Sequence, residues 1–156
     1  MNREKILELS RHIERARDVE FVENEEKLEF AEVCASSRPL SGYNQDCWVV
    51  GDCGCIAGHA IALFPDEALA IADDLVASSD AWKDLPPPTG HDMYSQYWCM
   101  SGTTFYRVAK RLLGLGVDDA WWVFAPTDCN GPEGKMEAVE RLTALYNHNQ
   151  PEGDLI

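Results

Sequence analysis

The residues best suited to chemistry lie in one short stretch, where Cys53, Cys55 and His59 follow Cys47. On a helix, Cys55 and His59 would share a face because they are four residues apart. Thiolate and imidazole groups are the usual ligands of a structural zinc ion. The stretch lacks the paired two-residue gaps of zinc fingers, however, and its small residues also suit close helix packing. We therefore expect reduced, buried thiols and no cofactor, with zinc bound by Cys47, Cys53, Cys55 and His59 as the alternative.

A cysteine nucleophile is a second chemistry that this stretch allows. The helix dipole stabilises a thiolate at a helix N-terminus, which is where Cys53 or Cys55 would lie. His91 or His148 could then serve as the base. Such an order of residues also arises by chance, and catalysis requires a geometry that spacing does not define. We therefore expect no catalytic residue, and retain Cys53, Cys55, His91 and His148 as candidates for a thiol- or zinc-dependent enzyme.

The charge of the chain restricts its partners. Its 13 basic and 27 acidic residues give a formal net charge of −14. Binding to nucleic acid or to an anionic membrane depends on cationic contacts, so neither is expected. An acidic surface attracts a basic one, including one that normally holds nucleic acid. The sequence thus predicts a basic or nucleic-acid-binding protein as the partner.

The expected contact surface combines acidic and aromatic side chains from residues 66–98. Aromatic residues in irregular segments either anchor partners or fasten a loop to the body of the protein. The predicted partner-binding residues are Asp66, Glu67, Asp73, Asp74, Asp80, Trp82, Asp84, Tyr94, Tyr97 and Trp98. Further along, Trp121 and Trp122 are adjacent on a predicted helix, so at least one of them should lie near the surface.

Most of the chain has helical periodicity, so we expect helices to position these residues. Apolar side chains recur at three- and four-residue steps in six segments. The predicted helices cover residues 2–18, 55–64, 65–77, 103–113, 118–124 and 132–147. Pro65 suits a first helical turn, Gly114 a left-handed helix end, and Asp118 a helix cap.

Two segments are less regular. Residues 19–33 suit a β-hairpin around 24–27, although residues 28–34 also contain good helix formers. Residues 80–100 contain Pro86-Pro87-Pro88 and predict a long aromatic loop, in which 94–99 would suit a short strand. The fold class is therefore mainly α, with α+β as the alternative: a compact helical bundle in a single domain over residues 1–156, with a small β-hairpin.

Other sequence features indicate the compartment. No apolar run is long enough to span a bilayer. The first 18 residues lack the apolar block of a secretory signal. The sequence therefore predicts a soluble cytoplasmic protein whose six cysteines remain reduced.

A resemblance extends over much of the chain. Tyr43 and Trp48 form an aromatic-x4-Trp element, which a Cys-Gly-Cys-x-Ala-Gly-x-Ala stretch follows at residues 53–60. This pattern resembles a family of small bacterial and phage proteins without an assigned activity, as do residues 112–115 and 124–126. The chain differs in its shorter gap between cysteines and its extra stretches at 19–40 and 80–100, and relatives often carry tryptophan at the position of His59. The resemblance implies a phage or mobile-element origin and no particular activity.

These observations favour a binding protein over an enzyme. The predicted function is that of an acidic protein-binding module. It would be a phage or mobile-element inhibitor that occludes a basic, nucleic-acid-binding surface by mimicry or steric blocking. The alternatives are a thiol- or zinc-dependent enzyme centred on Cys53, Cys55 and His59, and a self-associating structural protein. The sequence does not indicate an oligomeric state.

Overall fold

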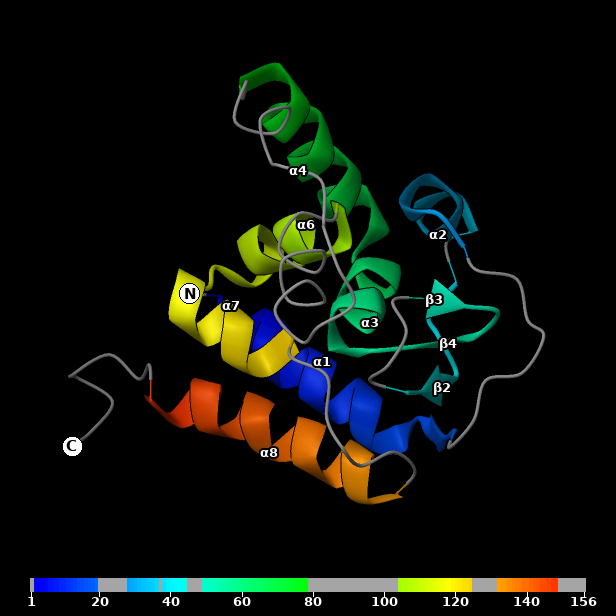
Figure 1. Cartoon of the computed structure of the whole chain (residues 1–156), viewed down its shortest axis with the longest axis vertical. Coiled ribbons are helices and arrows are strands. Elements are labelled where there is room, and N and C mark those ends of the chain that lie inside the picture. The colour runs from blue at the N-terminus through cyan, green and yellow to red at the C-terminus, as the bar shows by residue number, and fades with distance from the viewer. Residues whose placement is uncertain are drawn as a thin grey trace, which may run out of the picture.

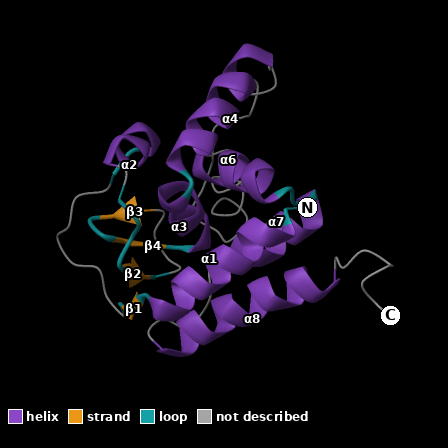
Figure 2. Ribbon diagram, turned by 180° about the vertical axis from the view of Figure 1, so that it is seen from behind, coloured by secondary structure: helices purple, strands orange, loops and turns teal. Residues whose placement is uncertain are grey.

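The computed structural model describes residues 2–19, 28–36, 38–44, 49–78, 104–124 and 132–148. These residues form seven helices and a small four-stranded sheet at one side of the helical body (Figures 1 and 2). The helices are α1 (Arg3–Arg15), α2 (Phe30–Ser36), α3 (Ile56–Leu63), α4 (Pro65–Ser78), α6 (Thr104–Leu113), α7 (Val117–Phe124) and α8 (Pro132–His148). The strands are β1 (Arg17–Asp18), β2 (Gly42–Tyr43), β3 (Val49–Val50) and β4 (Cys53–Gly54). The protein is thus mainly α with some β, as its sequence predicted.

Helix α3 occupies the centre of the core. Residues 56–62 are all buried, whereas the sequence suggested a single apolar stripe. A helix that is apolar all round requires neighbours on every side, and α1, α2, α4, α6 and α7 supply them. Their apolar side chains join those of α3 and α8 in one continuous hydrophobic cluster.

Helices α1 and α8 pack in antiparallel orientation along the other side of this body (Figure 1). Each helix places a cation at the C-terminal end of the other. Lys135 Nζ donates to the carbonyl oxygens of Glu14 and Ala16 at 3.0 and 3.1 Å, and Arg3 Nε donates to Tyr146 O at 3.2 Å. Because these carbonyls lie at helix ends, the two cations satisfy acceptors that lack helical partners and complement the helix dipoles.

The predicted helix end at Gly114 is confirmed. Gly114 has a φ of 66°, its N–H donates to Arg111 O, and the N–H of Leu115 reaches back to Lys110 O at 2.9 Å. This pair of bonds is the Schellman arrangement, and it turns the chain from α6 towards α7. Helix α7 begins at Val117, so its cap position is Gly116 and Asp118 lies in its first turn. The prediction that Asp118 caps this helix is wrong by two residues.

The sheet combines distant parts of the chain in the order β1-β2-β4-β3. Strands β1, β2 and β4 are parallel neighbours, and only β3 and β4 form an antiparallel pair. Gly51, with a φ of 61°, begins the tight turn between β3 and β4. A small hairpin is therefore present, but at residues 49–54 instead of 19–33.

The hairpin predicted over 19–33 is wrong because its second half is helical. Phe30 begins α2, and the N–H of Leu28 donates to Val49 O in β3. The helix formers at 28–34 thus prevailed over the short alternating pattern. The aromatic loop predicted over 80–100, with its short strand at 94–99, lies outside the described residues.

None of the helices in the described part of the chain has both the length and the apolar character needed to cross a bilayer.

Candidate functional site

The cysteine stretch forms a tightly packed corner between β4 and α3. Cys55 is the N-cap residue of α3, and its Sγ accepts a hydrogen bond from the N–H of Gly58 at 3.5 Å. Cys53, Cys55 and His59 are all buried. The thiol of Cys55 therefore caps the N-terminus of α3, where a hydroxyl or carboxylate is the usual capping group.

The environment of Cys55 differs from that of a cysteine nucleophile. Burial raises its pKa to about 12, although the hydrogen bonds from Gly58 and Ala57 act in the opposite direction. Reactive cysteines require the reverse, a lowered pKa with partial exposure. The proposed bases do not complete such a site within the described residues, since His148 is exposed at the end of α8 and His91 lies outside them. Cys53 is likewise buried in the sheet.

The four residues suggested for zinc are only partly described, because Cys47 lies outside the described residues. Across the ranges that the structure describes, no three His, Cys, Asp or Glu side chains gather closely enough to hold a metal ion by themselves. The ring of His59 instead forms a hydrogen bond with the strand β2, between its Nε2 and the carbonyl oxygen of Gly42 at 2.7 Å.

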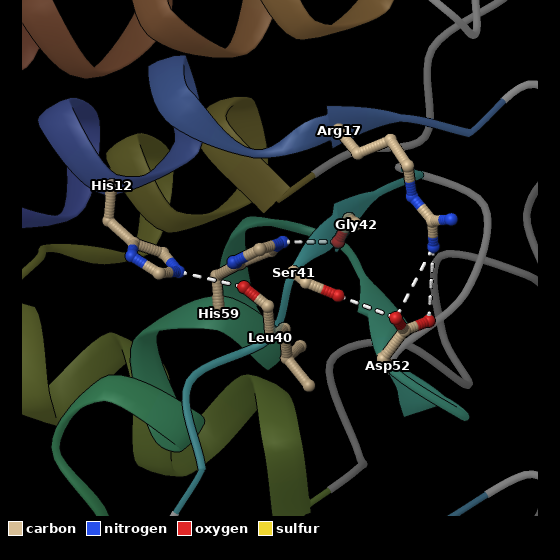
Figure 3. A network of polar contacts seen from close by, with 7 residues as sticks. All are labelled: His12, Arg17, Leu40, Ser41, Gly42, Asp52 and His59. Carbon is tan, nitrogen blue, oxygen red and sulfur yellow. Dashed lines mark hydrogen bonds and ion pairs between the residues drawn. The ribbon is translucent and has the colours of Figure 1, made fainter.

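A pair of histidines stands where α1, α3 and β2 meet. His12, from the last turn of α1, lies beside His59 with a distance of 5.3 Å between ring centroids. Its Nε2 bonds to Leu40 O at 2.9 Å, so the two rings hold carbonyls two residues apart on one segment (Figure 3). The sequence reasoning did not identify His12. His12 lies on the apolar side of the first helix, near Leu9 and Ile13. This position indicates a site only once the fold shows that His59 lies beside it.

His59 is fully buried, and its Nδ1 has no hydrogen-bond partner. Burial lowers its pKa to about 4, the hydrogen bond to Gly42 opposes this shift, and His12 adds to it. The ring is thus neutral at neutral pH, because its charged form would lose its hydration in the core.

A polar network ties the strands together beside this pair. Asp52 accepts hydrogen bonds from the hydroxyl of Ser41 and from Arg17 Nη2 (Figure 3), and its backbone carbonyl accepts the N–H groups of Ser41 and Gly42 at 3.0 Å. Space beside Gly42 is also limited, since a Cβ at this position would lie 3.0 Å from Val19 Cγ2. The network therefore supports the segment that the histidines hold.

Four of the six acidic residues predicted to bind a partner fall on α4, which extends away from the rest of the body (Figure 1). This helix carries Asp66, Glu67, Asp73 and Asp74 and no basic residue, and all four side chains are exposed. Glu67 and Asp74 are held by cations from neighbouring helices, through Lys5 Nζ at 2.6 Å and Arg111 Nη1 at 2.8 Å. Among the residues that can be described, Asp66 and Asp73 form no ion pair.

The spacing on α4 places Asp66 and Asp73 on one face. Residues seven apart lie nearly above one another, about 10 Å apart along the axis. Leu69 and Ala70, both exposed, lie between them. This face thus carries one carboxylate at each end and apolar side chains between them. The other predicted contact residues lie outside the described residues, and these are Asp80, Trp82, Asp84, Tyr94, Tyr97 and Trp98.

The prediction that at least one of Trp121 and Trp122 lies near the surface is confirmed. Trp122 is 47% exposed, while Trp121 is partly buried and its ring packs edge-on against Tyr106. Val117 and Met136 are also largely exposed, on α7 and α8. These two helices therefore present apolar side chains to solvent.

No family model matches the chain, and neither the curated proteins nor the solved structures contain a match to it.

Proposed function

We propose that this protein is an acidic protein-binding module that acts in the cytoplasm by covering a basic, nucleic-acid-binding surface of another protein. The observation that carries the proposal is the helix α4, which has four exposed carboxylates and no basic residue. A surface of this kind attracts a cationic one and speeds its association. The net charge of −14 also favours a cationic partner.

The ion pairs of α4 suggest how the face works. Lys5 of α1 and Arg111 of α6 form ion pairs with Glu67 and Asp74, so the charge of these two carboxylates is already compensated. Asp66 and Asp73 are left for an external partner. Mimicry of nucleic acid, in a phage or mobile-element inhibitor, is the specific form that we propose.

The test is a paired capture experiment with host lysate. The tagged protein is compared with Asp66→Asn/Asp73→Asn, and with a control that removes the same charge elsewhere, Glu8→Gln/Glu140→Gln, at two exposed positions of α1 and α8. We expect one stoichiometric basic partner that the control retains, the α4 variant loses, and increasing salt releases. Equal capture by both variants, or a complex indifferent to salt, would refute the electrostatic proposal.

A second candidate is a self-associating structural protein, which the exposed side chains of Val117, Trp122 and Met136 favour. Contiguous apolar patches are typical of surfaces that bind other proteins, and these residues lie on the neighbouring helices α7 and α8. Sedimentation at several concentrations tests this candidate. A monomer at all of them would exclude it, whereas an oligomer that Trp122→Gln disrupts would support it.

A further inference from the structure

The free nitrogen of His59 is the starting point. In the described part of the chain, its Nδ1 is the one buried side-chain nitrogen or oxygen without a hydrogen-bond partner. The hydrogen bond from Nε2 to Gly42 O places the proton on Nε2 and leaves a lone pair on Nδ1. Buried polar groups without partners are rare, and a bound ion is one of the explanations for them.

The ring of His59 also has the arrangement of a metal-binding histidine. Such residues typically donate their second ring N–H to a carbonyl or carboxylate, which orients the ring and makes the other nitrogen a better ligand. Gly42 O supplies this acceptor at 2.7 Å. The low pKa, about 4, means that no proton has to leave His59 before a cation binds at neutral pH.

A second ligand lies beside it. Figure 3 shows the rings of His12 and His59 side by side, with the second nitrogen of His59 on the side of His12. With Zn–N bonds of about 2.0–2.1 Å and a tetrahedral angle, two imidazole centroids lie about 5 Å apart. The observed distance is 5.3 Å. His12 is partly exposed, so an ion would reach the pair from its side.

We propose that His12 and His59 together bind one Zn²⁺ ion, with Leu40 O and solvent completing its coordination. Leu40 O lies 2.9 Å from His12 Nε2, so it is within reach of a cation that this nitrogen holds. On binding, His12 carries a proton on Nδ1 and presents the lone pair of Nε2 to the metal in place of its hydrogen bond to Leu40 O. The position of His12 in the last turn of α1 adds the partial negative charge of a helix C-terminus.

This site differs from a cysteine-centred one in its ligands. It uses His59 without Cys53 or Cys55, because the thiol of Cys55 caps α3 and its pKa, about 12, opposes formation of a thiolate. It is also independent of the proposed partner-binding function, which rests on α4. The two kinds of site have different spectra, since a thiolate bound to Co²⁺ gives intense near-ultraviolet absorption that imidazole and carbonyl ligands do not.

The experiment uses the full chain after dialysis against a chelator. Zn²⁺ is titrated by calorimetry into the wild type, His12→Gln, His59→Gln and the control His148→Gln, whose histidine is exposed at the end of α8, and Co²⁺ spectra are recorded in parallel. We expect one equivalent of Zn²⁺ for the wild type and the control, at least a tenfold loss of affinity in each of the other variants, and no thiolate band.

Three results would overturn the proposal: no binding by the wild type, unchanged binding by His12→Gln, or an intense thiolate band in the wild type. The partly exposed position of His12 makes its variant informative even where the buried substitution at His59 prevents folding.

Discussion

Because of His59, the free energy of unfolding is expected to decrease as the pH falls from 6.5 to about 4. One substitution should remove this dependence. The perturbation is His59→Gln, which keeps an amide N–H for Gly42 O but cannot be protonated. In the folded protein the pKa of His59 is lowered from 6.5 to about 4. As the pH falls below 6.5, the unfolded chain therefore binds a proton before the folded protein does. The stabilisation from neutral His59 is complete above pH 6.5 and is lost as the pH falls towards 4.

The size of the effect follows from the same values. Each pKa unit corresponds to about 1.4 kcal/mol, so the shift from 6.5 to about 4 contributes about 3 kcal/mol to the pH-dependent free energy of unfolding. The full effect applies because the ring is 0% exposed, and solvent cannot screen it. Such a loss is a large part of the 5–15 kcal/mol that is typical of domains of this size.

The assay is urea unfolding followed by circular dichroism between pH 4 and 8, with a chelator present so that metal binding does not contribute. Carboxylates also titrate near the lower end, so the informative quantity is the difference between the wild type and each variant. We expect His59→Gln to be less stable at pH 7.5 and to approach the wild type by about 3 kcal/mol as the pH falls to 4. The exposed control His148→Gln should follow the wild-type curve. Parallel curves for the wild type and His59→Gln would refute our account of the buried ring.

Three further outcomes are expected. Lys135→Met should lower the free energy of unfolding by about 1–2 kcal/mol in urea titrations, because the carbonyls of Glu14 and Ala16 lose their donor; an unchanged midpoint would contradict the capping role. Gly114→Ala should cost about 1 kcal/mol in the same assay, because the φ of 66° is unfavourable for a residue with a Cβ. Cys55 should resist iodoacetamide at pH 8 in the native protein and react after unfolding, as peptide mapping would show, because burial raises its pKa to about 12.

The long helices were predictable because local patterns and the core agree on them. The spacing of Ile6, Leu9 and Ile13 predicts the buried side of α1, and all three side chains are fully buried. Pro65 and Gly114 mark the start of α4 and the end of α6, since these residue types act on the backbone directly. Nothing beyond the neighbouring residues is needed for such predictions.

The sheet could not be predicted in this way. Its strands are two residues long, which is too short for an alternating pattern to emerge. Strand β2 takes its place through β1 on one side and β4 on the other, and its carbonyl at Gly42 is held by a histidine from α3. Contacts between segments so far apart in the chain depend on the tertiary fold and leave no local signal.

The candidate site was only partly predictable for the same reason. His59 attracted attention because it lies near cysteines in the sequence, yet the imidazole ring that packs beside it comes from α1. His12 looked like an ordinary residue of an amphipathic helix. Residue spacing reports which side chains share one element, whereas a site built from α1, α3 and β2 depends on how three elements meet.

The acidic face of α4 shows why a charge count alone was insufficient. The sequence marks four carboxylates on this helix as equivalent, but the fold divides them into two kinds. Glu67 and Asp74 meet Lys5 and Arg111, and they remain more than half exposed, so each pair adds little to stability. Their role is to cancel charge at the sides of the helix, which concentrates the uncompensated charge at Asp66 and Asp73. A partner would therefore meet two carboxylates about two turns apart with Leu69 between them, a far more selective target than an evenly acidic surface.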